Sequence, residues 1–338
     1  MLPDDNHSPK GVGHDEIDEF TLIDRYFRRS SSDYRVALGI GDDAAIVIPS
    51  AQRQLVVSAD TLVAGKHFFK DTDVASLGHK LLAVNLSDIA AMGAVARWFT
   101  LCLTLPHSNA DWLEKFSRGL FALADQHRLS LIGGDTTQGP LTLSLQIIAE
   151  IAPQQALCRH NAQSGDDIWL SAVVGGAALA IQQRQGKLSL SEADRHWCEQ
   201  RLDWPQPRLA LGQALNGVAH AAVDISDGLL ADLGHIAEAS ALAAEIHLPS
   251  LPTLPLQTKL DPQHLLSAQL SGGDDYELCF TAPVAQYAQI KALSQQLAIP
   301  LTRIGKMRAG KGVYLCDDNN ALRRWTQPVG FEHFRPNL

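Results

Sequence analysis

The sequence predicts a two-domain protein that combines α/β and α+β architecture, and three observations support this prediction. The chain has 338 residues, which is long for one hydrophobic core and sufficient for two domains. Short apolar runs of strand length alternate with longer segments of helical periodicity in both halves. A polar, loop-like crossing at residues 152–166 separates the halves. We therefore expect a flexible leader over 1–15, an N-terminal domain over 16–152 and a C-terminal domain over 153–338.

The composition is that of a globular chain with an acidic balance. Hydrophobic residues make up 46%, charged residues make up 19%, and the formal net charge is −9. That charge repels a phosphate backbone, which argues against a nucleic-acid partner. No apolar run approaches a membrane span, and the leader lacks the basic start and apolar centre of a signal peptide. The five cysteines form no C-x-x-C pair, so we expect reduced, mostly buried thiols in a cytoplasmic protein.

The first half begins with helical periodicity and continues with short strands. Apolar residues recur at helical spacing over 16–29 and predict a helix. Asp73 is the expected N-cap of a long helix through Met92, on which Asn85 and Asp88 lie near one face. The other elements expected here are strands at 36–40, 44–48, 54–59, 98–105, 129–132 and 141–147 and a helix at 110–127.

The second half repeats this style. A glycine pair precedes a helix of small residues, and Pro205 and Pro207 are expected to open another helix through Leu215. Asp227 is a suitable cap for the helix that follows it. The other elements expected here are strands at 167–172, 219–225, 276–281, 301–305 and 312–316 and helices at 191–202, 261–270 and 283–297.

Acidic residues recur beside small residues where predicted elements end or begin. The six segments are 39–45, 58–61, 85–88, 133–136, 224–228 and 272–275. Each one alone has a structural explanation, because Asp and Gly form turns and Asp caps helices. Together they are better explained by a cation, since gathered carboxylates repel one another. Oxygen-only ligands favour Mg²⁺ or a similar hard ion.

The recurring set predicts metal-assisted phosphoryl transfer. Its carboxylates and hydroxyls are Asp43, Asp60, Asp88, Asp135, Asp224, Asp227, Ser58 and Ser226. The motifs of other phosphate-binding and hydrolytic classes are missing from the sequence. There is no P-loop, G-x-G-x-x-G fingerprint, His-Arg-Asp loop, zinc spacing or G-x-S-x-G elbow.

Further candidates lie outside the acidic segments, and each has a structural alternative. His67 lies in a glycine turn beside Lys66, where it either meets a substrate phosphate or is an exposed loop histidine. Arg159 either binds a nucleotide phosphate with both arms of its guanidinium or is a surface arginine. Trp325 and Phe331 either pack in the core or cover a cationic ring.

The order of these segments resembles the thiamine-monophosphate kinase family of the aminoimidazole ribonucleotide synthetase superfamily. The resemblance runs from about Glu19 to Phe334 and rests on residues 20–27, 39–44, 60–68, 83–93, 131–137, 224–229 and 271–278. It implies an N-terminal α/β domain whose strands join a partner's into a dimeric β-barrel, so a homodimer is expected. It also implies a C-terminal α+β domain and a cleft between the domains for ATP and thiamine monophosphate.

The resemblance assigns roles to individual residues. It implies Mg²⁺ ligands at Asp43, Ser58, Ala59, Asp60, Asp88, Asp135, Asp224 and Asp227. Ala59 stands where relatives often carry Thr, so only its backbone carbonyl is left to bind a metal ion. ATP contacts are implied at Gly134, Asp135, Arg159 and Ser226. Substrate contacts are implied at His67, Asp274 and Phe331, and Asp274 is one methylene shorter than the usual Glu.

The implied reaction needs several Mg²⁺ ions and no catalytic general base. The acceptor is a phosphate monoester, whose second pKa of about 6 leaves it largely anionic near neutral pH. We therefore expect direct in-line transfer of the γ-phosphoryl group of ATP to thiamine monophosphate. The products are thiamine diphosphate and ADP, and no phosphoenzyme is required.

Three alternatives remain open. A sister synthetase of the superfamily is the nearest, but its selenophosphate branch needs an N-terminal Cys and none precedes Cys102. Its hydrogenase-maturation branch needs a C-terminal Cys, whereas this chain ends at Leu338. A metal-dependent phosphatase would use the same carboxylates to activate water. A non-catalytic thiamine-phosphate or Ca²⁺-binding protein would bind its ligand without turnover.

Overall fold

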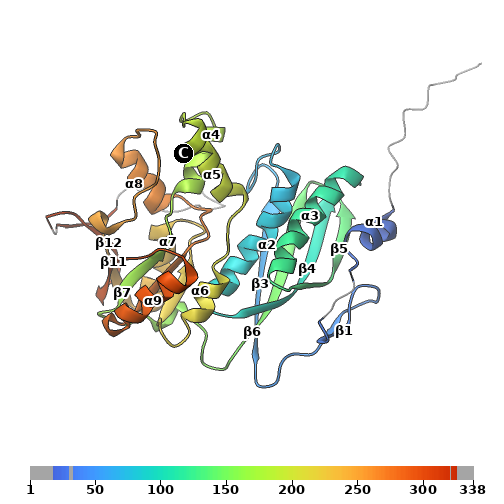
Figure 1. The fold of residues 1–338 in the computed structure, drawn as a ribbon, viewed down its shortest axis with the longest axis horizontal. Coiled ribbons are helices and arrows are strands. Elements are labelled where there is room, and N and C mark those ends of the chain that lie inside the picture. The colour runs from blue at the N-terminus through green and yellow to red at the C-terminus, as the bar shows by residue number, and fades with distance from the viewer. Residues whose placement is uncertain (1–17, 30–32, 320, 326–338) are drawn as a thin grey trace, which may run out of the picture.

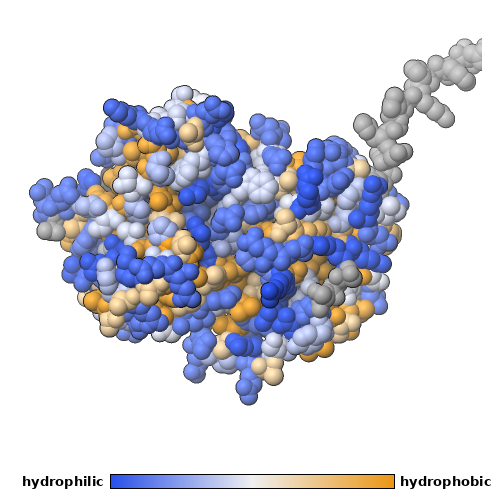
Figure 2. Space-filling view, in the orientation of Figure 1, coloured by the Kyte–Doolittle hydropathy of each residue, from blue (hydrophilic) through white to orange (hydrophobic). Residues whose placement is uncertain are grey.

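The computed structural model describes residues 18–29, 33–319 and 321–325, and its two large sheets each carry helices (Figure 1). The predicted leader over 1–15 and the predicted substrate contact Phe331 lie outside the described residues. No helix among the described residues is long and apolar enough to cross a membrane. The face shown in Figure 2 is a mixture of hydrophilic and apolar residues, as is usual for a folded protein's surface.

The N-terminal half is built on a four-stranded sheet in the order β3-β6-β4-β5. Helix α2 packs on one face of this sheet with α3 beside it, whereas the outer face of β3 is exposed (Figure 1). Because β3 and β5 are both edge strands, the sheet of a single chain is open rather than closed into a barrel. Its elements are α1 (Glu19–Tyr26), β1 (Val36–Leu38), β2 (Ile46–Val47), β3 (Gln54–Val63), α2 (Val74–Ala91), β4 (Val95–Leu105), α3 (Ala110–Gln126), β5 (Ser130–Gln138) and β6 (Thr142–Ile151).

Several predicted boundaries in this half are wrong. Asp60 lies inside β3 and Asp135 lies inside β5, so neither carboxylate is in a turn. Gly134, just before Asp135, serves a different purpose, because a Cβ there would lie 1.8 Å from the Leu101 carbonyl oxygen. Glycine thus lets β5 approach β4 closely instead of ending the strand. The first helix is also shorter than predicted, beginning at Glu19.

Helix α2 packs against both halves of the protein. The Asp73 side chain accepts the Ser76 N–H, which confirms the predicted N-cap. Of the 18 residues in α2, 15 are buried, because the helix is covered by its own sheet, by α3 and by the C-terminal half. One cluster of buried apolar residues accordingly runs from Leu81 and Leu86 on α2 to Leu211 and Phe280 in the C-terminal half.

The C-terminal half contains a seven-stranded sheet in the order β13-β12-β9-β11-β7-β10-β8. Helix α7 packs on β8, β9 and β12, and helices α4, α5 and α8 gather around a smaller apolar cluster. The elements are η1 (Arg159–Asn161), β7 (Asp167–Ser171), α4 (Gly176–Arg184), α5 (Glu192–Asp203), α6 (Leu209–Ala214), β8 (Ala221–Asp224), α7 (Leu229–Ala239), β9 (Leu242–His247), η2 (Leu248–Ser250), α8 (Pro262–Ser271), β10 (Leu278–Ala282), η3 (Val284–Gln286), α9 (Tyr287–Leu297), β11 (Leu301–Ala309), β12 (Gly312–Cys316) and β13 (Leu322–Arg323).

Three expectations for this half need correction. The helix expected to open at Pro205 begins at Leu209. Strand β9 was not predicted, because its two alanines weaken the strand signal. Asp227 does not cap α7; the N-cap is Gly228, and the Asp232 side chain reaches back to accept the backbone N–H groups before the helix.

The cysteines largely follow the expectation of buried thiols. All five are free. Cys198, Cys279 and Cys316 are buried and Cys158 is half-buried, but Cys102 is exposed on β4. The exception arises because Cys102 points to the outer face of the N-terminal sheet, which no helix of the described chain covers.

Candidate active site

A cavity of about 960 Å³ lies between the two halves. Its lining comes from β3 and α2 on one side and from the segments around β8, α4 and the α8–β10 connection on the other. The cavity brings together seven of the residues that the sequence predicted as site residues. They are Asp60, His67, Asp88, Asp224, Ser226, Asp227 and Asp274.

Hydrogen bonds fasten β3 to α2 beside their carboxylates. Ser58 Oγ on β3 donates to Asp88 Oδ2 on α2 at 2.5 Å. The Asp60 N–H donates to Asn85 Oδ1 at 3.2 Å, and the Asn85 amide in turn donates to the Leu81 carbonyl. The fully buried Asn85 therefore fixes β3 against α2 at the level of Asp60.

The C-terminal half contributes its carboxylates from the end of β8. Ser87 Oγ on α2 donates to Asp224 Oδ2 at 2.7 Å, which ties the two halves together beside the cavity. The segment after Asp224 is shaped by Asp232, whose Oδ2 accepts the backbone N–H groups of Ser226 and Asp227 at 3.1 Å each. Asp232 thus sets the position of Ser226 and Asp227 without lining the cavity itself.

Burial and mutual repulsion raise the pKa values of the gathered carboxyls. Burial, followed by the charge of Asp88, raises the pKa of Asp60 to about 6. The same two causes in the same order raise the pKa of Asp224 to about 8. Burial also raises the pKa of Asp88, although the Ser58 hydroxyl and the charge of Arg159 partly oppose it. In the metal-free protein, keeping these buried carboxyls ionised therefore costs free energy.

This donor set fits a hard divalent cation. Across residues 18–29, 33–319 and 321–325, no lysine or arginine forms an ion pair with Asp60, Asp88 or Asp224. The side chains that face one another carry only carboxylate and hydroxyl oxygens, which are the ligands Mg²⁺ prefers. A cation bound there would remove the repulsion that raises these pKa values.

Other predicted residues lie away from this cluster or at its edge. Asp43, Gly134 and Asp135 line a second cavity of about 690 Å³ between the 39–45 segment and β4 and β5. Ala59 lies in β3 between Ser58 and Asp60 and is exposed. Arg159, in η1, is exposed, yet its charge lowers the pKa of Asp88, which places it near the cluster.

His67 has a defined ring orientation. Its Nδ1 accepts the Val63 N–H at 3.0 Å, so in the neutral imidazole the hydrogen resides on Nε2. The side chain is half-buried and lines the main cavity beside Lys66. The arrangement agrees with a phosphate-facing donor better than with an exposed loop histidine.

Two residues around Asp274 were missed by the sequence reasoning. Lys80 Nζ on α2 lies 3.2 Å from Asp274 Oδ2, and the Tyr276 hydroxyl donates to Asp274 Oδ1 at 2.8 Å. A signal for Lys80 existed, because Lys80, Val84 and Asp88 follow one another at intervals of four and share a helix face. No comparable signal marks Tyr276.

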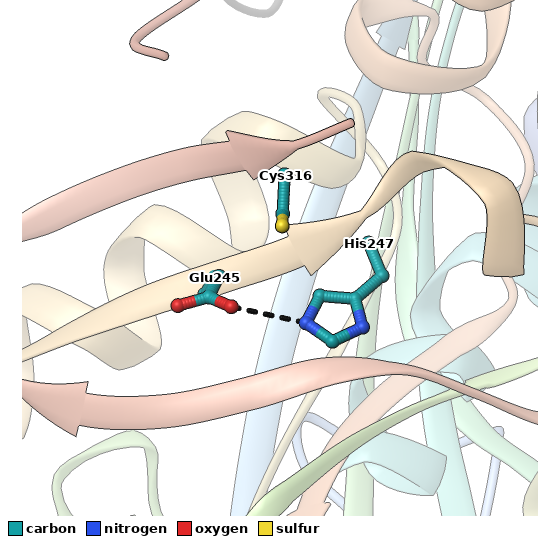
Figure 3. Close-up of side chains that lie close together, drawn as sticks. All are labelled: Glu245, His247 and Cys316. Atoms are coloured by element: carbon teal, nitrogen blue, oxygen red, sulfur yellow. Dashed lines mark hydrogen bonds and ion pairs between the residues drawn. The ribbon is translucent and has the colours of Figure 1, made fainter. Parts of the chain in front are cut away.

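A separate group of potential metal ligands lies on the C-terminal sheet. Glu245 and His247 of β9 and Cys316 of β12 come close together at neighbouring strand ends (Figure 3). Glu245 Oε1 lies 3.0 Å from His247 Nε2, and its Oε2 lies 2.5 Å from Arg308 Nε. Arg308 therefore already balances the carboxylate, and the group lines neither cavity. We give it no part in phosphoryl transfer.

Comparison with known proteins agrees with this geometry. Residues 41–151 match the family described as AIR synthase related protein, N-terminal domain, and residues 163–317 match the AIR synthase related protein, C-terminal domain. A thiamine-monophosphate kinase from Salmonella typhimurium is 47% identical over 321 residues, which cover 94% of this chain and 98% of that protein.

Solved structures show the same similarity in three dimensions. The crystal structure of thiamine-monophosphate kinase from Stenotrophomonas maltophilia aligns with a TM-score of 0.83 and 50% identity, covering 89% of this chain and 97% of that one. The structure described as AaThiL complexed with AMPPCP and TMP aligns with a TM-score of 0.74 and 25% identity, covering 94% and 97%. The chain belongs to the thiamine-monophosphate kinase family of the AIR synthase related proteins.

Proposed function

We propose that this protein transfers the γ-phosphoryl group of ATP to thiamine monophosphate and forms thiamine diphosphate. The observation that carries the proposal is the cluster of Asp60, Asp88 and Asp224, which three elements from both halves bring into one cavity. The family supports the proposal, since its members include proteins named thiamine-monophosphate kinase. The structure of one similar protein is described as complexed with AMPPCP and TMP.

Several Mg²⁺ ions are part of the proposal. Asp60, Asp88, Asp224 and Asp227 would hold them in the main cavity, with Ser58 beside them. Asp43 and Asp135 face the second cavity and remain predicted ligands, as does the Ala59 carbonyl. When bound, the cations supply neutralisation of the phosphate charges of donor and acceptor.

The chain's own residues bind and orient the two substrates. Arg159 at the edge of the cluster and Ser226 on the segment after β8 would contact ATP, with Gly134 in the second cavity. His67 would donate from Nε2 to the acceptor phosphate. Asp274 offers a carboxylate to the cationic part of thiamine monophosphate. No residue is needed as general base, because the acceptor phosphate is already anionic near neutral pH.

The functional unit in this proposal is a homodimer. Leu55 and Val57 are large apolar side chains about half exposed on the outer face of β3, which no helix among the described residues covers. Ile46 of β2 and Ile48 just after it are also about half exposed. A second copy of the chain would bury them by adding its own strands and closing a barrel.

We further propose that the chain has two domains, residues 16–152 and residues 153–338. We propose the cytoplasm, which supplies ATP, as its location.

The test is a product assay with ATP labelled at the γ-phosphate, thiamine monophosphate and Mg²⁺. Label in thiamine diphosphate is expected. Label released mainly as inorganic phosphate would favour a phosphatase, and substrate binding without turnover would favour a binding protein. Omission of Mg²⁺, with EDTA present, is expected to abolish product formation.

A further inference from the structure

We propose that Lys80 is a positioning residue that fixes Asp274 for the cationic end of the substrate. The inference rests on the proposed function and extends it to a side chain behind the described lining of the cavity. It concerns specificity for thiamine monophosphate rather than the phosphoryl-transfer step.

The first observation is the burial of the two charges. Lys80 is only 2% exposed, whereas the Asp274 side chain is 25% exposed at the cavity surface. Their atoms Nζ and Oδ2 lie 3.2 Å apart. An ammonium group is rarely buried without a partner, so Asp274 and Lys80 hold each other in place. The lysine lies behind the carboxylate, and the carboxylate faces the ligand space.

The second observation is that Tyr276 engages the other carboxylate oxygen. Its hydroxyl donates to Asp274 Oδ1 at 2.8 Å. Burial, then the charge of Asp274, raises the pKa of Tyr276 well above its usual value, so the hydroxyl keeps its proton and remains a donor. Asp274 Oδ1 thus accepts a hydrogen bond while Oδ2 forms the ion pair with Lys80, and each carboxylate oxygen has a further lone pair to offer a ligand.

The third observation is the backbone of this segment. Asp274 and Tyr276 both have left-handed backbone angles, with φ of 67° and 51°, which is uncommon for residues other than glycine. Hydrogen bonds from the Asp274 N–H to the Ser226 carbonyl and from the Tyr276 N–H to the Ile225 carbonyl, both 2.8 Å, hold them there. Such strain persists where surrounding contacts enforce it, and it concentrates at ligand-binding sites.

The fourth observation is the separation of charges along α2. Asp88 in the carboxylate cluster and Lys80 behind Asp274 are eight residues apart, which corresponds to about 12 Å along a helix. Thiamine monophosphate carries a phosphate at one end and a cationic ring system at the other. The phosphate belongs at the Asp88 end with its cations, which leaves Asp274 as the anion for the rings.

The alternative is that the pair only joins the two halves of the fold, and a matched control separates the two roles. His79, the neighbour of Lys80, is also buried and also joins the halves, with Nε2 2.8 Å from the Pro205 carbonyl oxygen. Lys80→Met removes one such polar link, and His79→Gln alters the other by replacing the buried ring. Only Lys80→Met removes a contact of Asp274.

The experiment measures kcat and both KM values for the wild type, Lys80→Met, His79→Gln, Asp274→Asn and the double variant of Lys80 and Asp274. Lys80→Met is expected to raise the KM for thiamine monophosphate about ten- to fiftyfold. Its kcat and its KM for ATP are expected to stay within about threefold, as are all His79→Gln values. The KM of the double variant for thiamine monophosphate is expected to exceed the higher of the two single-variant values by no more than about threefold, because both changes act through one carboxylate.

Tyr276→Phe gives a second measurement that does not depend on tolerance of Lys80→Met. It removes one hydroxyl donor and is expected to raise the KM for thiamine monophosphate about threefold or more, with the KM for ATP unchanged. Equal losses toward both substrates, multiplicative effects in the double variant, or an unchanged KM in Lys80→Met would overturn the inference. A wild type that forms no thiamine diphosphate would overturn the proposed function and this inference with it.

Discussion

Asp88 is the most informative single residue of the site, because its surroundings shift its pKa in opposite directions. Burial raises its pKa, while the Ser58 hydroxyl and the charge of Arg159 lower it. Its negative charge in turn raises the pKa values of Asp60 and Asp224. An ionised carboxylate in this position destabilises the metal-free fold. When a cation is bound, the attraction between the two makes the ionised form favourable.

Replacement of Asp88 by Asn should therefore separate activity from folding. We expect Asp88→Asn to lower kcat by about 10²- to 10³-fold, because the cations lose a ligand. Asp227→Asn is expected to act in the same direction. The melting temperature of Asp88→Asn should be unchanged or higher, since one repelling charge is gone. Asp111→Asn is the matched control, because Asp111 is exposed on α3 and pairs only with Lys115 among the residues described.

The assay compares steady-state turnover at saturating Mg²⁺ with thermal unfolding of the same preparations. Near-normal turnover of Asp88→Asn at saturating Mg²⁺ would contradict the role given to this residue. A large loss of stability would show instead that the carboxylate is needed for folding.

Stability should depend on pH through Asp224. Its pKa is raised to about 8 in the folded protein, so between pH 6.5 and 8 the folded state binds a proton that the unfolded state has already lost. Stability of the metal-free protein is therefore expected to fall across this range. The melting temperature in EDTA should drop by a few degrees from pH 6.5 to 8, and Mg²⁺ should restore more stability at pH 8 than at pH 6.5.

The control for this titration is Asp224→Asn, which removes this group and should weaken the dependence without abolishing it, because burial also raises the pKa of Asp232 to about 7 and that of Asp275 to about 8. Histidines titrate in a lower range, because burial lowers the pKa of His79 and partial burial lowers that of the half-buried His127. A metal-free melting temperature that rises between pH 6.5 and 8 would refute the assignment.

At the scale of elements, the acidic residues were recognised from the sequence but several of their settings were not. Spacing and capping identified α2 and its N-cap Asp73. Asp60 and Asp135 were expected in turns, yet β3 and β5 continue through them, since pairing with neighbouring strands outweighs local turn preference. The Lys80–Asp274 pair was out of reach, because 194 positions separate its members and only the packing of the two halves joins them.

Strand β5 offers a direct test of why glycine stands at position 134. A Cβ there would meet the Leu101 backbone, and φ is 152°, whereas nothing lies within 4 Å of a Cβ built on Gly133. We expect Gly134→Ala to destabilise the fold by about 3 kcal/mol and Gly133→Ala by less than about 1 kcal/mol. Chemical denaturation of both variants measures the difference. Equal stabilities would show that β5 and β4 have room to separate.

At the scale of the whole molecule, the open N-terminal sheet predicts self-association. Val57 is 55% exposed on the outer face of β3, and Val284 is 50% exposed in the C-terminal half. We expect Val57→Asp to convert a dimer into a monomer, because a charge would be buried at the interface. Val284→Asp should leave the dimer intact. Sedimentation velocity reports both, and a wild type that sediments as a monomer would contradict the proposed assembly.

The central claim is that carboxylates from both halves meet to hold divalent cations, and diffraction from crystals with Mn²⁺ in place of Mg²⁺ tests it most directly. With an ATP analogue bound, anomalous peaks are expected within about 2.2 Å of carboxylate oxygens of Asp60, Asp88 and Asp224. The peaks at Asp88 should be missing in Asp88→Asn and retained in Asp111→Asn. Peaks confined to the Glu245 group, or no peaks beside the three aspartates, would contradict the account.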